Sequence, residues 1–290
     1  MTPLRLRMIE DMRIRNLSPS TQKTYVEQVA RFARHFGKSP QLLGPPEVRS
    51  WRLHLAGDKR LAASSISVAV AALRFVYTVT LRQPWNVEHD IPTGRSPRKL
   101  PNVLSPAEVA AFLDAVESPR DRVILIVCYA AGLQVSEAVR LKPAAIDSKR
   151  MVIRVDAGKG GKDRYVMLSP RLLSILRDYW KTTHPKEWLF PGERPGEPIT
   201  RFTVERACRE ARERSGVTRM ITPHSLRHAF AVHLLESGAD LRTIQLLLGH
   251  RSLTTTSKYL RIATSTVCAT PSPLDSLRAV TPTVPDQVPA

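Results

Sequence analysis

The sequence predicts a mainly α-helical protein of two domains that carries one small β-hairpin. Apolar residues recur at helical spacings through most of the chain, whereas the segments 151–155 and 164–168 combine β-branched and apolar residues around a glycine-rich turn. A basic, proline-rich stretch over 84–103 is typical of a linker. We therefore expect an N-terminal helical domain over 1–83, a mixed α/β domain over 104–265, and a mostly disordered tail over 266–290 that is rich in proline and threonine.

The N-terminal domain shows clear helix boundaries. Ser18 offers an N-cap hydroxyl, Pro19 suits a first turn, and Gly37 is a typical C-terminal stop. Apolar side chains lie between them at helical spacings: Tyr25, Val29, Phe32 and Phe36. Two further helices are expected after Pro45-Pro46 and near Ser64-Ser65, with these residues facing inward: Val48, Trp51 and Leu55 in one, and Ile66, Val70, Leu73 and Tyr77 in the other.

The second domain begins with a capping box, in which Ser105 and Glu108 satisfy each other's backbone N–H groups. An apolar helix is expected over about Val123–Ala131, ending at Gly132, and a short one around Ser136–Leu141. After the hairpin, helical patterns continue over these ranges: 169–181, 202–214, 223–237, 240–248 and 254–262.

The charge of the chain points to a polyanionic partner. Lys and Arg total 44 against 26 Asp and Glu, a net charge of +18. A soluble surface needs only a net charge of about 2–8 in a small domain, so nucleic acid is the first partner to expect. The three cysteines are odd in number and widely spaced, which indicates neither a disulfide framework nor a zinc site. The charged segment Met1–Asn16 lacks a secretory pattern, and the apolar stretch Val123–Leu133 is too short to cross a bilayer, so we expect a cytoplasmic protein with no membrane partner.

Several side chains in the second domain suit phosphate chemistry. His224 and Arg227 lie one helical turn apart directly after Thr222-Pro223, a helix start, and helix N-termini favour anions. His250 follows a helix that ends at Gly249, Tyr259 comes nine residues later, and Lys159 lies in the hairpin turn. Taken one at a time, such residues are usually half-buried packing or solvated turns.

Two other kinds of site are weaker fits. His228 lies four residues after His224, as in a zinc-binding helix, but Ser225 stands where such a helix needs glutamate. The glycines around Lys159 resemble a nucleotide-binding loop, yet Asp163 follows Lys162 where serine or threonine is required. We therefore expect neither a metal nor a nucleotide, and no cofactor.

Taken together, these motifs have a known order. They comprise the Tyr129–Leu133 segment followed by Val135-Ser136-Glu137, then Gly158-Lys159-Gly160, His224-x-x-Arg227, Leu248-Gly249-His250 and Tyr259. In this order they resemble the tyrosine recombinase (phage-type integrase) family. The resemblance covers nearly the whole chain, so that residues 5–83 are similar to the SAM-like core-binding domain of the family and 104–265 to its catalytic domain.

The resemblance implies a role for each of these residues. Tyr259 would attack a DNA phosphate and form a 3′-phosphotyrosyl link without ATP or metal, releasing a 5′-hydroxyl. Arg227 and His250 would stabilise the nonbridging oxygens, His224 would assist proton transfer near the tyrosine, and Lys159 would protonate the leaving oxygen. The family exchanges strands as a tetramer in which a segment after the tyrosine docks on a neighbour, and Leu274–Val280 is the candidate segment here.

One position departs from the family pattern. Gln134 stands where the first catalytic arginine is expected, so a neutral amide replaces a permanent charge with a rigid fork of donors. Arg140 is six residues further on, which on a continuous helix would point away from Gln134, and Arg219 is a more distant substitute. Three interpretations follow: a slow but competent enzyme, a DNA-binding relative that no longer cuts, or a chain that carries a damaging change.

Three functions are therefore compared. The first is site-specific DNA recombination, as in integration or excision, and the second is non-catalytic DNA binding. The third is relaxation of supercoils in the manner of a type IB topoisomerase, which the N-terminal helical domain and the spacing from His250 to Tyr259 favour less. The candidate DNA contacts are the following basic residues: Arg74, Lys162, Arg164 and Arg251.

Overall fold

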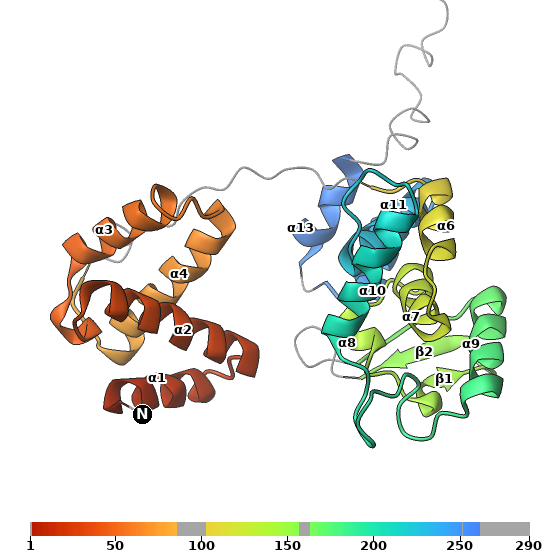
Figure 1. Ribbon diagram of the computed structural model, residues 1–290, viewed down its shortest axis with the longest axis horizontal. Coiled ribbons are helices and arrows are strands. Elements are labelled where there is room, and N and C mark those ends of the chain that lie inside the picture. The colour runs from red at the N-terminus through yellow and green to blue at the C-terminus, as the bar shows by residue number, and fades with distance from the viewer. Residues whose placement is uncertain (1, 86–102, 157–162, 251, 262–290) are drawn as a thin grey trace, which may run out of the picture. The chain divides into compact units, whose positions relative to one another are not determined.

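The computed structural model of the protein describes residues 2–85, 103–156, 163–250 and 252–261 (Figure 1). The chain forms two compact units, Met1–Arg98 and Lys99–Ala290. The predicted linker, the turn of the hairpin and the tail lie largely or wholly outside the described residues. Both units have a helical framework, and the second also contains a small sheet, so the predicted fold class is confirmed.

Unit 1 is entirely helical within the described residues. Its elements are α1 (Pro3–Ile14), α2 (Pro19–Phe36), η1 (Pro40–Leu42), α3 (Pro45–Ala56), α4 (Ala63–Phe75) and the π-helical turn η2 (Val76–Thr80). The predicted boundaries of α2 are confirmed, because the Ser18 hydroxyl accepts a hydrogen bond from the Thr21 N–H and Gly37 adopts φ +63°. Phe32, Trp51 and Leu73 meet in the core, as their spacing predicts.

One helical segment of unit 1 has the length and composition of a membrane span. Ala63–Thr80 joins α4 to η2 and has a mean hydropathy of 1.4. It is longer than Val123–Leu133, the apolar stretch considered from the sequence. Val70, Leu73 and Tyr77 are buried against the other helices of unit 1, and the Tyr77 hydroxyl donates to the Pro40 carbonyl at 2.9 Å. The apolar face of this segment therefore serves the core of the unit.

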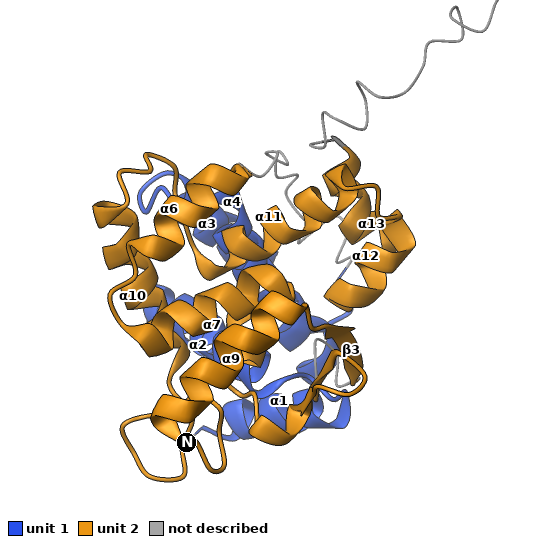
Figure 2. Ribbon diagram, turned by 90° about the vertical axis from the view of Figure 1, so that its right-hand side faces the viewer, with its two compact units in different colours: residues 1–98 blue, residues 99–290 orange. Residues whose placement is uncertain are grey.

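Unit 2 is built around one apolar helix. Its elements, in order, are α6 (Pro106–Asp114), α7 (Pro119–Ala130), α8 (Val135–Ala138), η3 (Pro143–Ala145), β1 (Ile146–Asp147), β2 (Val152–Val155), β3 (Arg164–Met167), α9 (Pro170–Thr183), α10 (Arg201–Arg214), α11 (Pro223–Glu236), α12 (Leu241–Leu248), α13 (Leu253–Thr256) and η4 (Ser257–Arg261). Helix α7 is apolar on most sides and packs against α9, α10 and α11 (Figure 2). The capping box of Ser105 and Glu108 begins α6 as predicted.

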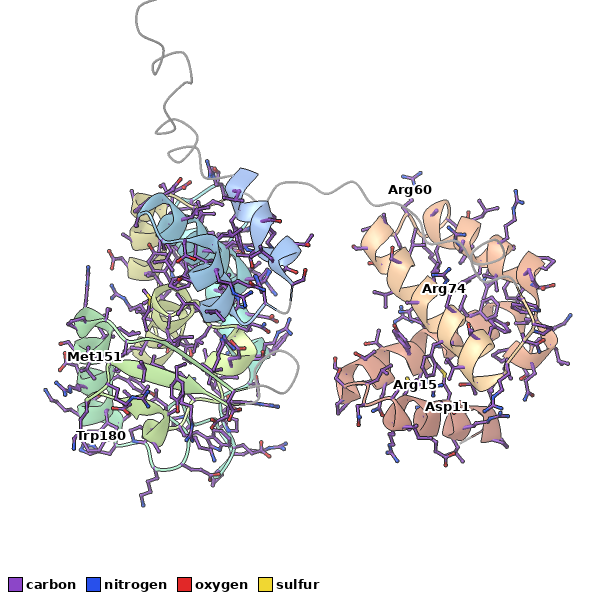
Figure 3. All side chains as sticks on the ribbon, turned by 180° about the vertical axis from the view of Figure 1, so that it is seen from behind. Asp11, Arg15, Arg60, Arg74, Met151 and Trp180 are labelled. Carbon is purple, nitrogen blue, oxygen red and sulfur yellow. The ribbon has the colours of Figure 1, made fainter. Side chains whose placement is uncertain are left out.

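The sheet contains the predicted hairpin and one further strand. Strands β2 and β3 pair antiparallel, with Val152 opposite Met167, and the two-residue β1 pairs with the other edge of β2. Met151, labelled in Figure 3, was expected to begin the first strand but adopts φ +54° in the turn between β1 and β2. The last predicted helix, 254–262, is also corrected: a single turn of α-helix, α13, passes into the 3-10 turn η4.

Candidate active site

Tyr259 lies inside unit 2 rather than on its surface. Tyr259 lies in the turn η4 and belongs to a buried apolar cluster with Phe230 of α11 and Ile244 and Leu248 of α12, and only 1% of the residue is exposed. Its hydroxyl oxygen lies 2.7 Å from Nδ1 of His228. The phenol is the donor when the imidazole carries its own proton on Nε2. The tyrosine singled out from the sequence therefore lies in a defined polar contact.

Helix α11 carries the other residues of the His-x-x-Arg motif. It begins as predicted, because the Thr222 hydroxyl accepts a hydrogen bond from the Ser225 N–H at 3.1 Å and Pro223 occupies the first turn. His224 is exposed at the start of this helix, and its ring centroid lies 4.2 Å from that of His228. The two imidazoles and the phenol thus extend inward from the surface, since His228 is only partly exposed and Tyr259 is buried.

Arg227 is 2% exposed, and its guanidinium is fixed by groups from three elements. Nη1 donates to the Gly132 carbonyl at 2.5 Å, Nη2 donates to the Leu248 carbonyl at the end of α12, and Nη1 lies 3.5 Å from a carboxylate oxygen of Glu137. Burial lowers the pKa of Arg227 to about 10, although Glu137 opposes this change, so the side chain is charged at neutral pH. The guanidinium is therefore held in one orientation with its charge intact.

Glu137 links two arginines in the interior. Arg164 donates two parallel hydrogen bonds to its carboxylate, at 2.7 and 2.8 Å, and a third from Nε to the Leu247 carbonyl at 2.9 Å. Burial raises the pKa of Glu137, but Arg164, the Gln134 N–H and Arg227 more than offset this effect, so that the net pKa lies below the usual range. Arg227 is therefore oriented by a carboxylate that Arg164 holds in turn.

The position of Arg164 corrects its expected role as a DNA contact. Its side chain is 10% exposed, and the ion pair with Glu137 directs its guanidinium into the domain. The alternation of side chains along β3 explains this orientation, because Arg164 shares a face with the buried Val166 whereas Tyr165 and Met167 are exposed.

Gln134 is the N-cap residue of the four-residue helix α8, and its backbone N–H donates to Glu137 at 2.8 Å. Its half-buried side chain and Arg140 line the same cavity of about 410 Å³, together with Lys142 and Arg154. The continuous helix on which Arg140 was expected to point away from Gln134 is absent. Because α8 ends at Ala138, Arg140 lies in the following turn and not on a continued helix.

The more distant substitute, Arg219, is held elsewhere. Its guanidinium donates to the Val103 carbonyl and lies 3.4 Å from the carboxylate of Glu108 at the start of α6. No contact described for this side chain connects it with Gln134.

His250 is anchored from two sides after the left-handed Gly249 ends α12. Its Nδ1 lies 2.8 Å from the hydroxyl of the buried Thr256, and its carbonyl accepts a hydrogen bond from the buried Gln245 amide at 2.9 Å. These contacts fix the imidazole close enough to His228 for the two rings to influence each other electrostatically.

The electrostatics of the Tyr259 contact favour the neutral forms of both groups. Burial raises the pKa of Tyr259 to about 12, although Arg227 opposes the change. Burial lowers the pKa of His228 to about 3, and His224, Lys258, Arg227 and His250 act in the same direction. At neutral pH the proton therefore stays on the phenol, and His228 is an uncharged acceptor.

The structure gives less information about the remaining predicted residues. Lys159, Lys162 and Arg251 lie outside the described residues. Arg74 is half-buried on α4 in unit 1 (Figure 3), so its role as a DNA contact stays a prediction. In the part of the chain that the structure describes, no group of three His, Cys, Asp or Glu side chains could hold a metal ion.

Sequence reasoning missed the partners that hold the site together. His228 was considered only as half of a metal pair, and Glu137, Gln245 and Thr256 were given no role. One signal was present for His228: it follows Arg227 directly and lies one turn after His224 on the same helix. Nothing comparable in the sequence indicates that Glu137 meets two arginines.

Residues 102–266 match the phage integrase family, and residues 4–87 match the N-terminal SAM-like domain of phage integrases. The integrase/recombinase y4qK of Sinorhizobium fredii is 59% identical over 289 residues, covering 100% of this chain and 94% of the relative. Tyrosine recombinase XerD of Pseudomonas aeruginosa is 38% identical over 231 residues, covering 74% of this chain and 75% of the relative.

A solved structure shares the fold. The lambda integrase fragment 75–356, crystallised as a dimer bound to a COC′ core site, superimposes with a TM-score of 0.71 at 20% identity, covering 87% of this chain and 92% of that one. The chain belongs to the phage integrase family of tyrosine recombinases, whose activity is site-specific DNA recombination by strand breaking and rejoining.

Proposed function

We propose that this chain recombines double-stranded DNA at specific sites inside the cell, through a transient covalent link between Tyr259 and a 3′-phosphate. The proposal rests on one observation. The Tyr259 hydroxyl makes a buried contact with His228 near the fixed guanidinium of Arg227. A phenol nucleophile beside a preorganised cation suits attack on a phosphodiester. The net charge of +18 suits a DNA partner.

The roles in this reaction follow from the chemistry of each group. The Tyr259 oxygen attacks phosphorus while Arg227 and His250 stabilise the charge on the nonbridging oxygens. Lys159 protonates the 5′-oxygen that leaves, and His224 assists proton movement from the surface. The phosphotyrosyl link conserves the energy of the phosphodiester, so rejoining needs no ATP. Exchange between two duplexes requires four protomers.

We further propose that Gln134 slows cleavage and leaves DNA binding intact. An amide at this position provides neutral donors on a shorter arm, and loss of one preorganised donor lowers rates by roughly 10²–10³. Glu137 and the cap of α8 fix the backbone of residue 134, so Gln134→Arg places a guanidinium there without changing the local fold.

The experiment measures covalent adduct formation on a nicked duplex that carries the binding site. Footprinting on the DNA that flanks the protein's coding region locates this site. We expect Gln134→Arg to form the adduct roughly 10²-fold faster than the native chain at equal DNA affinity. Equal adduct rates in the two proteins would contradict the proposed effect of Gln134.

A second candidate function, DNA binding without cleavage, is favoured by the same glutamine. In that case the native chain binds the site and forms no adduct, whereas Gln134→Arg forms it. A topoisomerase activity is separated by a different readout, the relaxation of supercoiled DNA without exchange between two marked duplexes.

A further inference from the structure

We propose that His228 is a catalytic residue of this chain: its Nδ1 accepts the phenol proton of Tyr259 during attack on DNA and returns it during rejoining. This inference rests on the proposed function and deepens it. It assigns the proton transfer at the nucleophile to a side chain other than His224, the histidine of the His-x-x-Arg motif.

The first support is direct contact. The Tyr259 hydroxyl and the His228 Nδ1 are 2.7 Å apart, within the range in which a positioned base takes a proton. His224 lies one turn away at the exposed start of α11, and its ring packs edge-on against His228 at a centroid distance of 4.2 Å. His228 thus lies between the nucleophile and the histidine that faces solvent.

The second support is the fixed geometry of the pair. Tyr259 is fully enclosed, and the centroids of the two rings are 5.6 Å apart with the planes tilted by 60°. The ammonium of Lys258 lies over the Tyr259 ring, 4.9 Å from its centre. A buried hydrogen bond between rigid aromatic rings holds the phenol oxygen in one direction, toward Nδ1 of His228.

The atoms and charges of the step balance. A bond forms between the Tyr259 oxygen and phosphorus, and the bond from phosphorus to the 5′-oxygen breaks. The phenol proton passes to Nδ1 of His228, and the 5′-oxygen takes a proton from Lys159 or from water and leaves as a hydroxyl. On rejoining, the 5′-hydroxyl attacks phosphorus and gives its proton back to Lys159 or to water. The bond to tyrosine breaks, and the His228 imidazolium returns its proton to the phenol oxygen.

The order of events follows from the surroundings of the pair. Burial opposes a positive charge on His228 most strongly, and His224, Lys258, Arg227 and His250 act in the same direction, so the resting imidazole is neutral and the phenol keeps its proton. A DNA phosphate bound at the site would bring a negative charge that offsets part of this opposition. The oxygen also loses its basicity as it bonds to phosphorus, so the proton moves during the attack and not before it.

The test uses substitutions that separate proton acceptance from contact. In His228→Asn an amide oxygen can still accept the phenol hydrogen bond, but it cannot take the proton. We expect the rate of adduct formation to fall roughly 10²–10⁴-fold while DNA affinity and thermal stability are retained. In His228→Ala we expect a similar loss that added imidazole partly restores, because a diffusible base can occupy the space left by the ring.

A matched control lies on the same helix. His233 also meets a tyrosine hydroxyl through Nδ1, 2.9 Å from Tyr129, but it has no part in the proposed chemistry. We expect His233→Asn to form the adduct at the native rate. This control separates the loss of a buried histidine on α11 from the loss of the base.

Two results would overturn the inference. If His228→Asn cleaves at the native rate, the contact only holds the tyrosine in its resting position. His228→Ala would then cleave as fast as the native chain or faster. If His228→Ala binds DNA but imidazole restores nothing, proton acceptance by this residue is also wrong.

All rates are measured in the native chain and with Gln134→Arg present. If neither background forms an adduct, the proposed function fails. If either forms one and the His228 changes have no effect, only the present inference fails.

Discussion

Two histidines of helix α11 each contact a tyrosine hydroxyl, and we assign a different role to each of the two pairs. In each, a hydroxyl meets Nδ1 of a histidine, at 2.7 Å for Tyr259 with His228 and 2.9 Å for Tyr129 with His233. The Nε2 of His233 lies 2.9 Å from the Leu104 carbonyl, so the second pair ties α7 and α11 to the start of unit 2. The first pair is surrounded by Arg227, Lys258 and two further histidines.

The difference lies in the charges around each pair and not in the hydrogen bond. Burial raises the pKa of both tyrosines, but only for Tyr259 does a neighbouring cation, Arg227, oppose that rise. A cation beside the oxygen stabilises the charge that develops when the phenol attacks. We therefore propose that the Tyr129 pair stabilises the fold and that the Tyr259 pair takes part in the reaction with DNA.

The largest expected effect comes from removing each hydroxyl in turn. Tyr259→Phe should abolish the covalent adduct and leave DNA binding unchanged, because no other group supplies the attacking oxygen. Tyr129→Phe should keep the adduct and lower the free energy of unfolding by about 1 kcal/mol, the usual net value of one hydrogen bond. Denaturing gels detect the adduct. Adduct formation by Tyr259→Phe would contradict the distinction between the two pairs. So would a folded Tyr129→Phe variant that forms no adduct.

The next effect concerns the carboxylate that positions Arg227. Glu137→Gln leaves the guanidinium groups of Arg164 and Arg227 buried without a compensating charge. We expect the free energy of unfolding to fall by about 3–5 kcal/mol, the usual cost of breaking a buried ion pair from one side. Urea denaturation measures this change.

The exposed pair of Arg201 and Glu205, with an N–O distance of 2.7 Å, provides the control for that substitution. Glu205→Gln should cost under about 1 kcal/mol, as is usual for surface pairs. Equal losses in the two variants would show that Glu137 is not the buried centre of the network.

The smallest expected effect is a pH dependence of stability. The pKa of His228 is about 3 in the folded chain, below the ordinary value of 6.5, so the unfolded chain binds the extra proton first as the pH falls. Stability should therefore decline from about pH 6.5 downward, by up to about 1.4 kcal/mol per pH unit for this one group. Glu137, whose pKa is lowered, adds a further loss only below its ordinary value of 4.5.

The window between pH 6.5 and 5 thus isolates the histidine. Chemical denaturation at several pH values should show a shallower slope there for His228→Asn than for the native chain and for His233→Asn. Identical slopes in all three proteins would contradict the buried, neutral state of His228.

The sequence predicted the elements that have strong local signals. Caps and apolar spacing placed α2, α6 and α11, and the glycine-rich turn between two β-branched segments placed the hairpin. The strand β1 was missed because two residues, Ile146 and Asp147, show no alternation, and the single helical turn of α13 is too short for periodicity to distinguish it from η4.

The site was predicted as a set of residues but not as a network. Motif order identified Tyr259, Arg227 and His250, yet the hydrogen-bond partners of these residues come from distant parts of the chain. A strand position alone does not show whether Arg164 faces solvent or a carboxylate 27 residues away. The helical direction assumed for Arg140 likewise failed where α8 ended early.

The most direct test of the central claim is to identify the amino acid that becomes attached to DNA. The native chain and Gln134→Arg are incubated with the nicked duplex, and the trapped adduct is digested and analysed by mass spectrometry. We expect a nucleotide on Tyr259 in a 3′-phosphate linkage, formed faster with Gln134→Arg. Attachment at another residue, or no adduct from either protein on DNA that both bind, would contradict the assignment of Tyr259 as the nucleophile.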